Sequence, residues 1–189
     1  DVRKLVESRE ILRWLQRSVG DYDLHDAMNE LIEKTSLNTI TDEMLAARMA
    51  IALDPQGPIR YKGVCLMPKA IGAALAQTYL EKNAQHQQVL AEIIASDLVA
   101  YWMKQPGNAS SLMVTVSKEV DQAHGYISVQ GPGYGLERAL YELQPHVPCY
   151  SELFARYYML SLRQLLPALD ELAADSRRPA EPLDRHTAG

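Results

Sequence analysis

The sequence has few cysteines, and they are not clustered. Cys65 and Cys149 lie too far apart along the chain to form a CxxC metal or redox motif. So little cysteine excludes a disulfide-dense secreted scaffold and favours a reducing compartment. No basic start followed by an apolar core marks a secretory signal, so we expect a cytoplasmic protein.

Long apolar runs and an excess of basic residues are also missing. No run approaches the about 18 residues that a membrane-spanning helix requires, which argues against membrane insertion. The formal net charge is −5 at pH 7, whereas nucleic-acid-binding surfaces carry clustered basic charge. We therefore expect no nucleic-acid partner. Because the chain opens at Asp1 rather than at a methionine, we expect a domain of a larger protein.

Two consecutive helical patterns, from Pro68 to Lys104, form the longest regular stretch of the chain. Pro68 suits the first turn of a helix, and Pro106-Gly107 ends the second pattern. Apolar residues recur between them at helical spacing: Ile71, Leu75, Tyr79, Val89, Leu90, Ile93, Ile94 and Leu98. We expect a helical hairpin or a bent helix that joins at Asn83.

Further helices are predicted on both sides of this stretch. Asp21 or Asp23, and then Thr41, are residue types that cap helix N-termini. The last predicted helix is apolar on most of its circumference, which predicts burial against several neighbours, and Pro167 should kink it. The predicted helices cover residues 2–19, 24–34, 42–53, 136–143 and about 149–175.

One strand is predicted over Ile59–Leu66, because this segment is bounded by prolines and rich in branched or aromatic residues. A single strand is not stable alone, so it needs a partner. The segment 111–130 offers two alternatives: a hairpin of 112–116 with 126–129, or a helix from Ser111 to Ala123 followed by an extended Tyr126–Gln130 beside the strand. We favour the helix. The fold class is then mainly α, a multi-helix bundle-like domain with a small β element of one or two short strands or a hairpin. Residues 1–175 form this single domain, and 176–189 form a disordered C-terminal tail.

Candidate chemistry is sparse. Asp21, Asp23 and His25 follow the alternation that opens a calcium loop, but the glycine and the closing glutamate of such a loop are missing, so we expect no metal and no cofactor. His146 and Cys149 flank Pro148 at the start of the last predicted helix, where an imidazole could activate a thiol. They are weak catalytic candidates, because spacing alone does not establish their geometry.

A glycine run at Gly131, Gly133 and Gly135 precedes a predicted helix, a context in which backbone N–H groups can approach a phosphate. It is a weak candidate for nucleotide binding. Pro132 donates no N–H, and the spacing matches neither the dinucleotide fingerprint nor a P-loop.

Tyrosines dominate the aromatic residues, with ten of them against one phenylalanine. Tyrosine combines apolar area with a polar tip, which suits interfaces. Together with an arginine stripe at helical spacing in the first helix, they give the candidate partner-binding residues Tyr134, Tyr141, Tyr150, Tyr158, Arg9, Arg13 and Arg17. We therefore expect a non-enzymatic helical protein-interaction or adaptor domain with a protein partner or neighbouring domain. The alternative is a small enzyme using Cys149 and His146, or a nucleotide-binding module using the glycine run.

Overall fold

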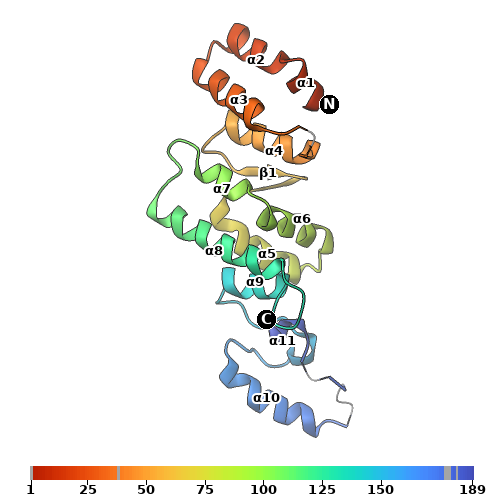
Figure 1. The fold of residues 1–189 in the computed structure, drawn as a ribbon. Helices are drawn as coiled ribbons and strands as arrows, with labels where there is room; N and C mark the ends of the chain where they lie inside the picture. The colour runs from red at the N-terminus through yellow and green to blue at the C-terminus, as the bar shows by residue number, and fades with distance from the viewer. Residues whose placement is uncertain (1, 38, 177–179, 182) are drawn as a thin grey trace. The chain divides into compact units, whose positions relative to one another are not determined.

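The computed structural model describes residues 2–37, 39–176, 180–181 and 183–189 (Figure 1). This described part is mainly helical and contains one two-stranded antiparallel sheet, which confirms the predicted fold class. The chain divides into two compact units: unit 1 comprises Asp1–Ala70 and Ser96–Ser117, and unit 2 comprises Ile71–Ala95 and Lys118–Gly189. The single domain over residues 1–175 stays a prediction, because two compact units can still unfold together.

Unit 1 begins with five helical segments: α1 (Val2–Glu7), α2 (Glu10–Trp14), the π-helical η1 (Leu15–Val19), α3 (Tyr22–Lys34) and α4 (Asp42–Leu53). The continuous helix predicted for residues 2–19 is wrong. Arg9 takes a left-handed backbone conformation, with φ of 52°, between α1 and α2. The break lets Val6, Leu12 and Leu15 all turn into one core, and such burial outweighs the local preference for an unbroken helix.

Side-chain caps fix the starts of α3 and α4, as the sequence predicts. The carboxylate of Asp21 accepts a hydrogen bond from the N–H of Leu24 at 3.0 Å, and the Thr41 hydroxyl accepts one from the N–H of Met44 at 3.2 Å. Each cap satisfies an N–H group that has no partner within the helix. The core of unit 1 then combines Val6, Leu12, Leu15, Met28, Leu31, Leu45, Met49 and Ala52.

The predicted strand is in fact a hairpin. Strand β1 (Ile59–Tyr61) pairs antiparallel with β2 (Val64–Leu66) across a turn at Lys62-Gly63. Both turn residues have positive φ, 45° and 82°, which is the signature of the two-residue turn that matches the twist of a hairpin. The extended partner predicted at Tyr126–Gln130 is wrong, since α8 (Ser111–Ile127) is a helix that continues into that segment.

Two buried side chains, Trp102 and Asn108, form hydrogen bonds to the loop before β1, and we call this pair the polar latch. Helix α7 (Leu98–Met103) carries Trp102, whose indole N–H donates to the Gly57 carbonyl at 2.7 Å. Asn108 is buried, and its amide donates to the carbonyls of Pro55 at 2.5 Å and Trp102 at 2.8 Å. The short 3₁₀ turn η2 (Pro68–Ala70) ends this unit's first segment.

Unit 2 contains α5 (Ile71–Leu80), α6 (Ala84–Ala95), the second part of α8, α9 (Leu136–Leu143), the 3₁₀ turn η3 (Glu152–Phe154), α10 (Leu162–Ala174) and α11 (Arg185–Ala188). The predicted join at Asn83 is confirmed, since its side chain accepts from the N–H of His86 in the first turn of α6. The continuous second helix is wrong. It is interrupted at Ser96-Asp97, where the carboxylate of Asp97 accepts from Arg48 at 2.7 Å.

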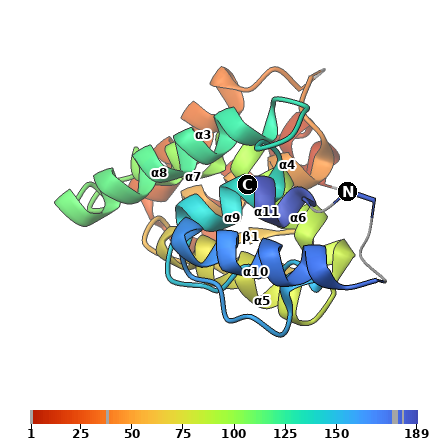
Figure 2. The ribbon, with the colours of Figure 1, turned by 90° about the horizontal axis from the view of Figure 1, so that it is seen from below.

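Helix α9 packs on α5 at a contact that requires glycine. A Cβ atom at Gly72 would lie 2.5 Å from the Leu143 carbonyl oxygen, closer than any side chain allows. Helix α11 in turn packs on α9, and the two lie side by side in both ribbon views (Figures 1 and 2). The disordered tail over residues 176–189 stays a prediction: the described residues 183–189 include α11, and residues 177–179 and 182 lie outside the described part of the chain.

The helix predicted from Cys149 is also wrong over its first part. Residues 149–161 form a loop around η3, and α10 starts only after Ser161. The side chain of Gln164 accepts from the N–H groups of Leu160 at 2.7 Å and Ser161 at 3.2 Å, which fixes the helix start there. The loop and the inner face of α10 share a core of Phe154, Met159, Ala168 and Leu172. Pro167 lies within α10.

Candidate functional site

A cluster of three tyrosines and one histidine organises the C-terminal part of unit 2. His186 of α11 presents its ring edge-on to Tyr79, Tyr141 and Tyr150, at centroid distances of 5.1, 6.0 and 6.4 Å. We call these four residues the tyrosine–histidine cluster. Edge-to-face packing places the positive rim of one ring on the negative face of another, so the cluster fixes α11 by geometry as well as by buried area.

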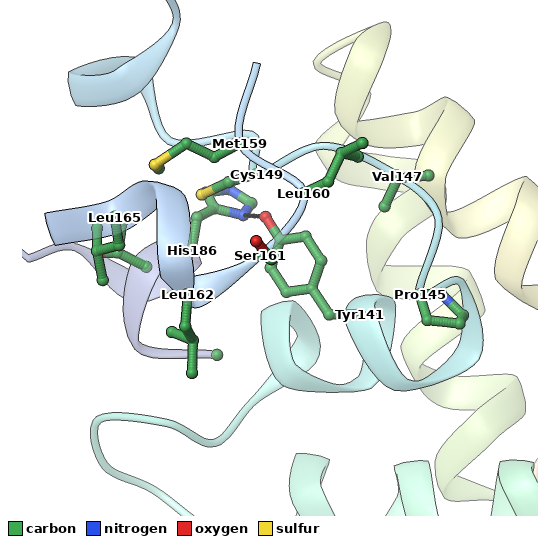
Figure 3. Close-up of a pocket in the computed structure, with 12 residues that line it drawn as sticks. Tyr141, Pro145, Val147, Cys149, Met159, Leu160, Ser161, Leu162, Leu165 and His186 are labelled. Carbon is green, nitrogen blue, oxygen red and sulfur yellow. Dashed lines mark hydrogen bonds between the residues drawn. The ribbon is translucent and has the colours of Figure 1, made fainter. Parts of the chain in front are cut away.

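Hydrogen bonds connect this cluster internally. The Tyr141 hydroxyl lies 2.9 Å from Nδ1 of His186 (Figure 3). The same hydroxyl accepts from the N–H of Tyr150 at 3.0 Å. Burial lowers the pKa of His186, against the opposing charges of Glu137 and Asp184. The ring is therefore neutral near pH 7.

A second set of bonds secures the segment that carries His186. The Ser151 hydroxyl donates to Asp184 at 2.7 Å, and Asp184 caps α11 by accepting from the N–H of Thr187 at 3.0 Å. Arg138 of α9 donates to the carbonyl of Gly189 at 2.8 Å. This segment is not predicted from the sequence as a helix, because its capping pattern, Asp184 to Thr187, covers only four residues among prolines and charges.

A pocket of about 220 Å³ opens beside the cluster. Its lining is largely apolar: Pro145, Val147, Cys149, Met159, Leu160, Leu162 and Leu165, with Tyr141, Ser161, His186, Thr187 and Gly189 supplying the polar atoms. Figure 3 shows Tyr141 and His186 between the leucines of α10 and the loop that carries Cys149. Among the described residues, no Asp, Glu, Lys or Arg side chain lines it, so this lining suits an uncharged group. Its volume lies below the roughly 300–1,000 Å³ of drug-sized ligand sites and fits a single side chain.

The proposed nucleophile pair is not assembled. His146 is exposed, whereas Cys149 is half-buried in the pocket wall, and no hydrogen bond joins these two described residues. Burial raises the pKa of the Cys149 thiol, although the N–H of Ser151 and the Tyr141 hydroxyl oppose this effect. A raised pKa keeps the thiol protonated, which is the opposite of an activated nucleophile.

The glycine run uses its own backbone groups internally. The N–H of Gly135 donates to the Tyr126 carbonyl at 3.0 Å, and that of Tyr134 donates to Gly131 at 3.3 Å. The carboxylate of Glu137 lies beside Gly135, where a Cβ atom would approach it to 3.3 Å. A negative charge in the first turn of α9 occupies the position that a phosphate would need.

The candidate partner-binding residues fall into three groups. Tyr134 and Tyr158 are exposed, whereas Tyr141 and Tyr150 are half-buried in the tyrosine–histidine cluster. The three arginines Arg9, Arg13 and Arg17 are exposed on unit 1. The break at Arg9 interrupts the straight stripe that the sequence predicts.

Metal and membrane sites are not found in the described part of the chain. There, no group of three or more His, Cys, Asp or Glu residues is placed to hold a metal ion. Within the same residues, no helix has both the length and the apolar character needed to cross a membrane. Comparisons with protein families, with curated proteins and with solved structures find no significant match to this chain.

Proposed function

We propose that this chain is a protein-interaction domain that binds an apolar side chain of a partner protein in the pocket of unit 2. One observation carries the proposal: two exposed leucines, Leu160 and Leu162, line that pocket, and the exposed Tyr158 lies two residues before Leu160. Scattered apolar residues are normal on a protein surface, but a group beside a concave site marks binding.

The pocket's chemistry supports a side chain rather than a cofactor. Its wall is apolar, its floor carries the neutral His186 and the Tyr141 hydroxyl, and its rim consists of leucines. Buried anchor side chains inserted into such pockets supply most of the affinity of protein interfaces. The expectation of a larger cytoplasmic protein accompanies this proposal, since both cysteines are free thiols.

The enzymatic and nucleotide-binding alternatives have weaker support. No hydrogen bond joins the described residues Cys149 and His146, and the Cys149 thiol has a raised pKa. Glu137 stands where the glycine run would receive a phosphate.

A peptide library displayed on phage tests the proposal. We expect the purified chain to enrich peptides that share one large aliphatic or aromatic residue. Leu160→Glu should weaken the affinity for a selected peptide about tenfold or more, because it places a charge on the pocket wall. The chain should still fold, since the Leu160 side chain is half exposed. Fluorescence anisotropy of the labelled peptide measures this, with the chain kept below about 10 µM.

Leu112→Glu is the matched control, since Leu112 is an exposed leucine of α8 outside the pocket. It should leave peptide affinity unchanged. Enriched peptides that bind wild type and Leu160→Glu equally, or no enrichment at all, would contradict the proposal.

A further inference from the structure

Helix α10 exposes an apolar face that its own unit does not cover. The side chains of Leu162 and Leu166 are 78% and 73% exposed and lie one helical turn apart. The inner face is already packed, because Leu165, Ala168, Leu169 and Leu172 contact Phe154 and Met159. Leu162 and Leu166 are therefore not part of the core of unit 2.

Two opposite charges flank Leu166 on this same outer face. Arg163 precedes it by three residues and Asp170 follows it by four, and both spacings return to one side of a helix. Both residues are exposed, and neither has an ion-pair partner among the described residues. They lie seven residues apart, about 10 Å along the axis, which is too far for a pair within α10.

The charge order distinguishes the ways in which two such helices can pair. A parallel pair would place arginine opposite arginine and aspartate opposite aspartate. An antiparallel pair about a twofold axis between Leu166 and Pro167 places Arg163 of one copy opposite Asp170 of the other, twice, and brings the two Leu166 side chains close to each other. Opposite charges at flanking positions fix orientation in helix pairs, and twofold symmetry is the commonest form of self-association.

We propose that α10 pairs antiparallel with α10 of a second copy of this chain. The two Leu166 side chains form the apolar contact, and the two Arg163–Asp170 pairs set its register. Leu166, Arg163 and Asp170 do not line the pocket, so this inference goes beyond the proposed function and does not rest on it. A contact between two helices is small for a stable interface, so the association is in the micromolar range, about 10–500 µM.

Sedimentation velocity of the full chain across this concentration range tests the pairing. Wild type shifts from monomer to dimer as concentration rises, and Leu166→Asp remains monomeric with unchanged circular dichroism. Leu112→Asp, at an exposed leucine of α8, associates like wild type. A wild-type chain that stays monomeric throughout, or a Leu166→Asp variant that still dimerises, overturns the proposal.

A charge exchange tests the antiparallel register separately. Arg163→Asp alone and Asp170→Arg alone are each monomeric, because each places like charges opposite one another. An equimolar mixture of these two variants forms a heterodimer, since both charge pairs are then complementary, and the double variant Arg163→Asp/Asp170→Arg dimerises with itself. A mixture that remains monomeric while wild type dimerises overturns the proposed register.

Discussion

Helices α1–α4 and helix α10 differ in how part of their leucines are covered. Leu12, Leu15, Leu31 and Leu45 are at most 6% exposed, whereas Leu162 and Leu166 of α10 face outward. Both regions have the apolar spacing of an amphipathic helix. The comparison shows that periodicity identifies an apolar face but does not identify what covers it. In unit 1 the cover is the unit's own core, and for α10 we propose another protein chain.

The largest expected effect comes from placing the same charge at a buried leucine of unit 1 and at an exposed leucine of α10. Leu45→Asp should unfold the chain, because it buries an unpaired carboxylate at a cost of several kcal/mol against a total stability of about 5–15 kcal/mol. Leu166→Asp should change the free energy of unfolding by less than about 0.5 kcal/mol. Urea denaturation followed by circular dichroism measures both. Equal destabilisation by the two variants would mean that α10 is buried on all sides.

The polar latch of unit 1 should show the next largest effect. Asn108→Ala removes two hydrogen bonds, so we expect a loss of about 1–3 kcal/mol. The Pro55 carbonyl loses its Asn108 donor, whereas the Trp102 carbonyl still accepts from the N–H of Gln105 at 3.1 Å. Asn29→Ala, which removes one surface bond to Glu33, is the control at under about 0.5 kcal/mol. Similar losses of stability for Asn108→Ala and Asn29→Ala in thermal melts would mean that the hydrogen bonds of the polar latch contribute no more than a surface hydrogen bond.

The packing of α11 should weaken as pH falls. The pKa of His186 is lowered when its ring is packed, chiefly by burial. Below the ordinary histidine pKa of about 6.5, the unpacked ring takes up a proton that the packed ring does not, so packing is lost progressively down to the folded-state pKa. Above about pH 6.5 the His186 ring is neutral in both states, and its contribution to the packing of α11 is complete.

Hydrogen exchange of the backbone amides of residues 184–189, between pH 5 and 7.5, measures this loss after correction for intrinsic rates. His186→Phe keeps an aromatic ring but does not titrate, so its protection should be independent of pH in this range. The pKa of Asp184 is lowered by bonds from Ser151 and Thr187 that outweigh the effect of burial, and its titration falls in a more acidic window. A wild-type response matching that of His186→Phe would exclude the histidine as the cause.

The smallest effect concerns the arginines of unit 1. Arg9, Arg13 and Arg17 are exposed, so glutamine at all three positions should change stability by less than about 0.5 kcal/mol per site. Differential scanning calorimetry measures this. A sharp fall would show that the side chains hold the break between α1 and α2, for example through the bond from Arg13 to the carbonyl of Ser8.

The sequence predicted those features that local chemistry controls. Asp21 and Thr41 cap their helices, and Asn83 joins α5 to α6, because each of these residues satisfies backbone groups within three residues of itself. The hairpin turn was predictable in the same way but was missed, since Lys62-Gly63 is a less familiar pair than Asn-Gly for two positive φ angles.

The features that escaped prediction depend on distant contacts. The break at Arg9 follows from the core that three other helices complete, and the loop over 149–161 follows from the burial of Phe154 against α10. His186 gains its role only from Tyr79, Tyr141 and Tyr150, which lie far from it in sequence. No pattern within the tail itself encodes such neighbours.

The distribution of tryptophan gives the two units different optical signatures. Both tryptophans of the chain, Trp14 and Trp102, belong to unit 1, and Trp102 is buried with its indole N–H bonded to Gly57. Tryptophan emission excited at long wavelength therefore reports the unfolding of unit 1, while tyrosine absorbance reports both units, with seven of the ten tyrosines in unit 2. Coincident transitions of the two signals during denaturation would identify a single cooperative domain, and separated transitions would show that the two units unfold independently.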